Sequence, residues 1–274
     1  MTISFEKAPL KEIIVDLRWG ASRFPRELPL NQTVSLSPSS FLVDSAHEQL
    51  FMNLGEELSK MGYGRSERLT PAGFPSLPTQ SVYRYQSNSA APKSVLFQAG
   101  LGQFSAHGVL PYRSWEEFLP RVRNGLEALL RVYPQTFGEE PFSQVTLRYI
   151  DFFDEELTQG RDVVTFMSEV LSIPLQLPGF MTAIATGKKT EDMLVKFSMP
   201  VAVGKLTINI GDGKFNNRPG ILLDTSAVTG SATAPAVDKI IDVLNASYTI
   251  LHDMFLNLTK PLHQLMEPKG GVTA

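Results

Sequence analysis

Arg148, Asp151 and His252 have the side-chain types that bind ligands or transfer protons. Arg148 and Asp151 lie in a run of β-forming residues, whereas His252 lies on the apolar side of a helical pattern. A carboxyl group flanked by Ile150 and Phe152 is costly to bury without a partner. We therefore interpret Arg148 and Asp151 first as an ion pair made through a neighbouring strand. A ligand-binding pair is the second interpretation.

Two further candidate ligand-binding residues, Tyr112 and Trp115, lie at the expected start of a helix. We expect the Trp115 indole to pack this helix against a sheet, with its N–H near the surface. The alternative is that the two aromatic residues form a binding hot spot.

An acidic cluster follows the strand that contains Asp151 and comprises Asp154, Glu155 and Glu156. Paired carboxylates can bind magnesium or act as acid and base. Charged residues that end a strand are more commonly just solvated, and that is our interpretation of residues 154–156.

Several kinds of chemistry have no support in the sequence. The chain contains no cysteine, which excludes disulfides, thiolate metal sites and a cysteine nucleophile. No pair among its four histidines has the spacing that places two metal ligands on one helix face, so we predict neither a metal site nor a cofactor. No serine lies in the Gly-x-Ser-x-Gly motif of hydrolases. Two glycine-rich runs, Gly100–Gly102 and Gly211–Gly213, do not match a phosphate-binding loop and are interpreted as turns.

The composition is that of an ordinary globular protein. The 274 residues are 43% hydrophobic and carry a net charge of -3, which does not indicate a nucleic-acid-binding surface. No apolar run has the length of a membrane span, and the first residues do not resemble a signal peptide. We therefore expect a cytoplasmic protein with no membrane partner.

Hydrophobic periodicity predicts four helices and a series of short strands. The helices are expected over 42–61, 115–133, 163–172 and 235–260. The strands are expected over 12–18, 82–86, 94–98, 103–107, 144–153, 181–186, 193–199, 205–210 and 220–226. Pro120 predicts a bend or a later start in the second helix, and Pro261 must end or kink the fourth. Segments 64–81, 87–93 and 134–141 are interpreted as loops or linkers.

This order of elements predicts an α+β fold built from two similar halves related by a pseudo-twofold axis. Residues 1–140 would form a β-α-β-β-β-α half and residues 141–268 a β-α-β-β-β-β-α half, with 269–274 a flexible tail. Each half would be a mainly antiparallel sheet with helices packed on one face, because the connections between strands are too short for parallel pairing.

Four stretches together resemble a sporadically distributed bacterial family of uncharacterised function and similar length. They lie around Pro9-Leu10, Tyr112–Trp115, Arg148–Asp151 and His252–Phe255, in the same order along nearly the whole chain. The family has asparagine where this chain has Asp151, and an amide can donate as well as accept a hydrogen bond. The resemblance implies no activity or catalytic residue. Its patchy distribution is associated with mobile or defence-linked genes, including immunity and antitoxin proteins.

We therefore expect a non-enzymatic binding protein that acts on a protein partner, with a homodimer as one form of association. The first alternative is a small-molecule sensor with an apolar pocket under the helix at 235–260, lined by Tyr83, Tyr85, Phe97, Phe197 and Tyr248. The second alternative is an enzyme that uses Arg148, Asp151 and His252 in a cleft.

Overall fold

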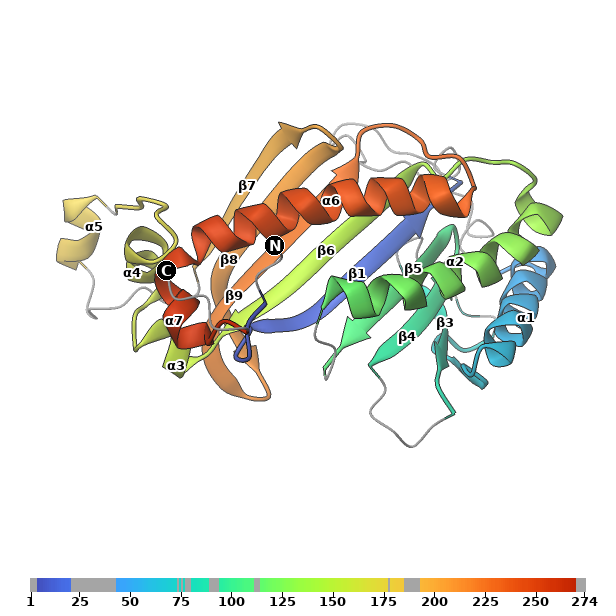
Figure 1. Cartoon of the computed structure of the whole chain (residues 1–274), viewed down its shortest axis with the longest axis horizontal. Coiled ribbons are helices and arrows are strands. Elements are labelled where there is room, and N and C mark those ends of the chain that lie inside the picture. The colour runs from blue at the N-terminus through green and yellow to red at the C-terminus, as the bar shows by residue number, and fades with distance from the viewer. Residues whose placement is uncertain are drawn as a thin grey trace. The chain divides into compact units, whose positions relative to one another are not determined.

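The computed structural model describes residues 4–20, 43–72, 74, 76, 80–88, 94–110, 114–176, 178–184 and 193–269 (Figure 1). The strands are β1 (Leu10–Arg18), β2 (Arg65–Arg68), β3 (Ser81–Gln86), β4 (Val95–Gly100), β5 (Gln103–Val109), β6 (Gln144–Phe153), β7 (Leu194–Val201), β8 (Gly204–Phe215) and β9 (Arg218–Thr229). The helices are α1 (Ser45–Lys60), α2 (Trp115–Phe137), α3 (Glu155–Thr158), α4 (Val163–Glu169), α5 (Gly179–Ile184), α6 (Val237–Leu258), the 3₁₀ turn η2 (Lys260–Leu262) and α7 (His263–Met266).

The fold is α+β, as predicted, with an antiparallel sheet of nine strands. The strand order is β2-β3-β4-β5-β1-β6-β9-β8-β7, so β2 and β7 are the edge strands. The predicted duplication of two similar halves stays a prediction.

Contacts divide the chain into two compact units that do not follow chain order. Unit 1 comprises Met1–Glu12, Arg148–Ala227 and Tyr248–Ala274, and unit 2 comprises Ile13–Leu147 and Val228–Ser247. The sequence analysis predicts two similar halves that meet near residue 140. The compact units are defined by contacts and not by similarity, so they do not test that prediction.

In unit 2, helices α1 and α2 contact each other and pack against strands β3, β4 and β5 (Figure 1). The side chains of Tyr85, Phe97 and Phe104 are fully buried in this core. Gly125 of α2 is needed there, because a Cβ atom at this position would lie 2.3 Å from Cε1 of Phe97. The helix and strands therefore approach at a distance that only glycine allows.

The first turn of α2 is capped, and Pro120 does not delay the start of the helix. The Ser114 hydroxyl accepts a hydrogen bond from the backbone N–H of Glu117 at 3.3 Å, as the capping pattern predicts. The helix begins at Trp115, which excludes the later start, so the bend is what remains of the effect predicted from Pro120. A proline this close to the helix start removes a single backbone donor, and the helix tolerates that loss.

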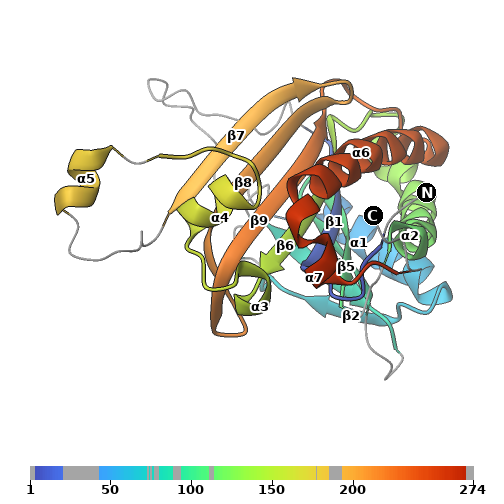
Figure 2. The ribbon, with the colours of Figure 1, turned by 60° about the vertical axis from the view of Figure 1, so that its left-hand side comes forward.

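In unit 1, strands β7, β8 and β9 lie side by side with β7 outermost (Figure 2). The β8–β9 turn consists of Asn216 and Asn217, which both have positive φ angles (50° and 63°), the backbone that a tight hairpin needs. The turn predicted at Gly211–Gly213 is wrong, because these residues continue β8. Gly211 instead allows close backbone approach, since a Cβ there would lie 2.4 Å from the carbonyl oxygen of Met193.

Three other predicted boundaries differ from the structure. Residues 179–184 form helix α5 rather than a strand at 181–186, and Pro178 immediately precedes the helix, where its missing N–H costs nothing. Residues 65–68 form β2 inside the predicted loop 64–81. Helix α2 continues to Phe137 into the predicted linker. Pro261 acts as predicted: α6 ends at Leu258 and the chain continues as η2 and α7.

Among the helices that the structure describes, none combines the length and the apolar composition that spanning a bilayer requires.

Candidate functional site

Arg148 and Asp224 form a bidentate ion pair in unit 1. Nε and Nη2 of Arg148 donate to the two carboxylate oxygens of Asp224 at 2.7 and 2.8 Å, and Nδ2 of Asn209 lies 3.4 Å from the same carboxylate. The three residues lie on β6, β9 and β8, which are neighbouring strands of the sheet. The predicted ion pair between Arg148 and Asp151 is therefore wrong, because Arg148 pairs with Asp224 on the neighbouring strand β9. An occupied fork of this kind holds two strands together.

Asp151, the carboxyl group among the predicted site residues, is buried, with 3% of its surface exposed. Burial raises its pKa to about 7, Lys11 opposes the shift and the negative charge of Asp224 adds to it. A carboxyl group with such a pKa is a proton donor or acceptor near neutral pH.

The other three predicted residues do not join Arg148 and Asp151 in one described cluster. Tyr112 lies outside the described residues. The Trp115 indole is buried and its N–H donates to Oδ1 of the exposed Asn245 on α6 at 3.1 Å, so the N–H lies near the surface, as predicted. His252 lies on α6 and stacks on Tyr248, with ring centroids 5.1 Å apart. Such stacking on a helix neighbour is typical of a histidine that packs within the structure.

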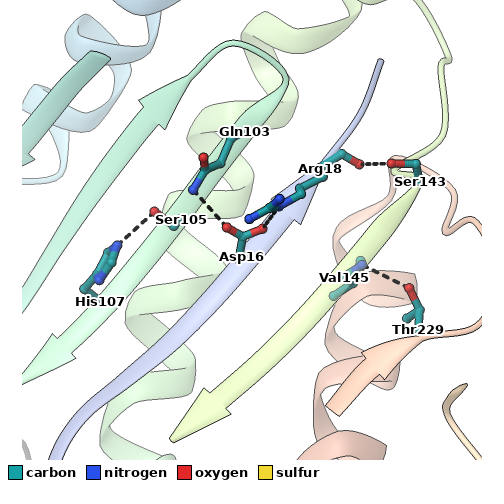
Figure 3. Close-up of polar contacts among 8 residues, drawn as sticks. All are labelled: Asp16, Arg18, Gln103, Ser105, His107, Ser143, Val145 and Thr229. Atoms are coloured by element: carbon teal, nitrogen blue, oxygen red, sulfur yellow. Dashed lines mark hydrogen bonds and ion pairs between the residues drawn. The ribbon is translucent and has the colours of Figure 1, made fainter. Parts of the chain in front are cut away.

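A second polar cluster, in unit 2, was missed by the sequence analysis. Asp16 on β1 accepts hydrogen bonds from Nε of Arg18 and Nε2 of Gln103, each at 2.9 Å (Figure 3). Burial raises the pKa of Asp16, and Arg18, the nearby His107 and Gln103 oppose the shift. Nearby on β5, the Ser105 hydroxyl lies 2.9 Å from Nε2 of His107. The only sequence signal was the alternation that places Gln103, Ser105 and His107 on one face of a strand.

This cluster resembles a serine–histidine–aspartate arrangement in residue types but not in geometry. In such a triad the carboxylate orients the histidine that activates the serine. Here both carboxylate oxygens of Asp16 are engaged, one by Arg18 and the other by Gln103. The Ser105 residue is also 1% exposed, which leaves a substrate no described route to its hydroxyl. The arrangement is that of a buried polar network between β1 and β5.

The predicted acidic cluster lines a cleft of about 1080 Å³ in unit 1. Asp154 caps α3 by accepting from the backbone N–H of Leu157 at 3.3 Å, and Glu156 pairs with Lys7 at 2.9 Å. Arg161, Lys214 and Arg218 also line the cleft. Among the described residues, no group of three or more histidines and carboxylates has the geometry to hold a metal ion.

Strand β7 is the most exposed apolar strand in the described part of the chain. Leu194 is 72% exposed and Met199 43% exposed, and helix α5, which precedes β7 in the chain, exposes Phe180 and Ile184 by 70% and 78%. Of the eight large exposed hydrophobic side chains among the described residues, four thus lie within residues 180–199.

Searches against protein-family models, curated proteins and solved structures found no match to this chain. The resemblance to the sporadically distributed bacterial family therefore stays a prediction.

Proposed function

We propose that this protein is a non-enzymatic binding protein whose partner, another polypeptide chain, adds as an antiparallel strand to the free edge of β7. The observation that carries the proposal is a strand of eight residues with exposed apolar side chains at the end of the sheet. In strand addition, backbone hydrogen bonds supply affinity and alternate side chains supply specificity.

The hydrogen-bond pattern of β7 defines which backbone groups are available. Asp212 donates its backbone N–H to the carbonyl of Met193 at 3.0 Å, and hydrogen-bonded pairs recur at every second residue of an antiparallel ladder. In the observed register, residues 195, 197, 199 and 201 therefore direct their backbone groups at β8. Residues 194, 196, 198 and 200 direct theirs outward, where no described strand pairs with them.

Pro200 supports this assignment of the two edges. It lies at an outward position, where its missing N–H takes nothing from the ladder with β8. The outer edge thus offers N–H donors at Leu194, Lys196 and Ser198, and carbonyl acceptors at these residues and at Pro200.

The side chains of β7 indicate the chemistry of the added strand. Val195, Phe197 and Met199 share the face on which β8 carries Ile210, Ile208 and Leu206. A strand with apolar side chains at alternate positions would extend this face.

The setting of this function is also a proposal. The resemblance to a patchily distributed bacterial family supports an immunity, antitoxin or other defence-associated role in the cytoplasm. The order of strands and helices supports an internal duplication. Residues 10–137 and residues 144–258 form two segments, and each segment starts with a strand and finishes with a long helix.

The test compares Lys196→Pro with Lys196→Ala in the full chain, each used as bait in a lysate of the host organism. Proline removes an outward N–H and leaves the ladder with β8 intact, whereas alanine removes the side chain alone. We expect K196P to recover at least tenfold less of the protein that the unmodified chain captures. K196A should recover as much of it as the unmodified chain does. Amide hydrogen exchange of Leu194, Lys196 and Ser198 should slow in the purified complex.

Thermal unfolding of both variants identifies a folding defect before binding is compared. Equal capture by K196P and the unmodified chain would overturn the proposal. So would a complex in which the three outward amides exchange as fast as in the isolated protein.

A further inference from the structure

We infer that the chain that adds to β7 is a second copy of this protein, so that two β7 strands pair antiparallel about a twofold axis. The inference rests on the proposed function, because it names the occupant of the same edge. Antiparallel pairing of identical strands is self-complementary and closes after two copies, as most homodimeric interfaces do.

The alternation of backbone groups restricts the register of such a pair. Outward groups lie only at residues 194, 196, 198 and 200, so each of these must face another outward residue of the second copy. A twofold axis at Phe197 pairs Lys196 with Ser198 and Leu194 with Pro200. The two Lys196–Ser198 pairs then form two hydrogen bonds each, and the two Leu194–Pro200 pairs form one each, because proline has no N–H.

Two neighbouring registers are less favourable. An axis at Lys196 places the two lysines directly opposite each other, and like charges at this position are destabilising. An axis at Ser198 faces Lys196 with Pro200, which loses a donor, and leaves Leu194 opposite the β7–β8 turn. The axis at Phe197 combines the full strand length with a serine opposite each lysine.

The side chains match in this same register. Phe197 meets Phe197 of the second copy on the axis, and Val195 meets Met199 on either side of it. These three residues lie on one face of β7, so the pairing continues the apolar face that β8 begins with Ile208. On the other face the exposed Leu194 packs against Pro200. Aromatic and aliphatic cross-strand pairs of this kind stabilise antiparallel sheets.

The experiment uses the absence of cysteine from the natural chain, because any disulfide must come from the introduced residue. In the inferred register residue 197 forms a non-hydrogen-bonded pair with itself, with a Cα separation of about 4.5 Å. That separation lies within the range that a disulfide spans, roughly 4.4–6.8 Å. Phe197→Cys should therefore form a covalent dimer under mild oxidation.

Lys196→Cys is the matched control. Its two copies would lie diagonally across the strand pair, about 7–8 Å apart. We expect F197C to cross-link at least tenfold faster than K196C. Light scattering of the unmodified chain should give twice its mass of 30.3 kDa, which tests the dimer without any substitution.

Each outcome decides the inference. A doubled mass with fast cross-linking only at residue 197 supports it. A monomeric mass, or a dimer in which F197C and K196C cross-link equally, overturns it. A monomer whose β7 amides are protected by a different captured protein overturns the second copy as occupant but leaves the proposed function standing.

Discussion

The two units each contribute one edge strand to the sheet, and the two edges are built differently. Strand β2 in unit 2 has four residues, of which Arg65, Glu67 and Arg68 are charged. Strand β7 in unit 1 has eight residues and a single charge, Lys196. Short, charged edges resist pairing with another chain, whereas long apolar edges invite it. Under the proposed function, the protein blocks association at β2 and permits it at β7.

The charges of β2 are also tied into unit 2. Arg68 pairs with Glu48 of α1 and donates to the Tyr83 hydroxyl at 3.1 Å. Arg84 on β3 lies 3.7 Å from Glu67. A strand added to β2 would have to displace or desolvate these groups. Lys196, in contrast, is the single charged residue of β7. In the inferred pairing of two β7 strands it faces Ser198 of the second copy, so no like charge lies opposite it.

The two units also differ in how they bury a carboxyl group. In unit 2, Asp16 accepts two hydrogen bonds, from Arg18 and Gln103. In unit 1, Asp151 has a pKa of about 7 because burial outweighs the attraction of Lys11. The first carboxyl group has partners that offset the cost of burying its charge, whereas the second is stable in its neutral form.

Met199→Lys should give the largest effect on self-association, because it makes β7 resemble β2. In the inferred dimer Met199 faces Val195 of the second copy, and the substitution would bury two charges. At about 1–2 kcal/mol each, this weakens self-association roughly 100-fold. Sedimentation equilibrium measures the change in dissociation constant. Folding of the single chain should change little, since Met199 is 43% exposed.

The control for Met199→Lys is a lysine introduced on β2, the other edge strand. Ser66→Lys in β2 adds a lysine to an already exposed strand and should leave the dissociation constant unchanged. If S66K weakens the dimer as much as M199K, the two edges do not differ in the way proposed here.

Asp151→Asn should give the largest effect on the stability of the single chain, through its pH dependence. The pKa of Asp151 is about 7 in the folded chain, against the ordinary aspartate value of 3.8 expected in the unfolded chain. Because the folded state holds the proton more tightly, stability is lost as pH rises from about 4 to 7. The loss corresponds to about 4 kcal/mol above pH 7, at 1.36 kcal/mol for each pKa unit. Asparagine stays neutral and should remove it.

Urea unfolding at pH 4, 6 and 8 measures this effect. The free energy of unfolding of D151N relative to the unmodified chain should rise with pH. Asp16→Asn is the matched variant in unit 2 and should show a smaller rise, because Arg18 and Gln103 compensate the charge of Asp16. A D151N difference that is constant across pH would show that Asp151 is ionised in the folded protein.

Local patterns in the sequence predicted most elements but few of the contacts. Alternating apolar residues located β1 and β6, and Pro261 ended the long helix as expected, because both signals depend on neighbouring residues. Gly211 and Gly213 misled the turn prediction, since glycine serves both turns and close strand contacts. The Asn216-Asn217 turn lay a few residues further on.

The polar clusters could not be predicted in the same way. Asp16 and Gln103 are 87 residues apart, and Arg148 and Asp224 are 76 apart. Their contacts depend on which strands are neighbours in the sheet, which no local pattern encodes. Asp151 was recognised as unusual because a single carboxyl group in an apolar strand is itself a local signal.

Glu67→Gln on β2 should give the smallest effect. It tests whether the Glu67 carboxylate is needed to keep other chains from pairing with β2. The Arg84–Glu67 pair is long at 3.7 Å, and the side chains are 34% and 48% exposed. A pair of this kind contributes about 0.5 kcal/mol or less, so urea unfolding should barely change. Self-association should also stay unchanged, because β2 keeps its two arginines and only four residues can pair. A new oligomer formed by E67Q through β2 would mean that a single carboxylate, rather than the shortness of the strand, protects this edge.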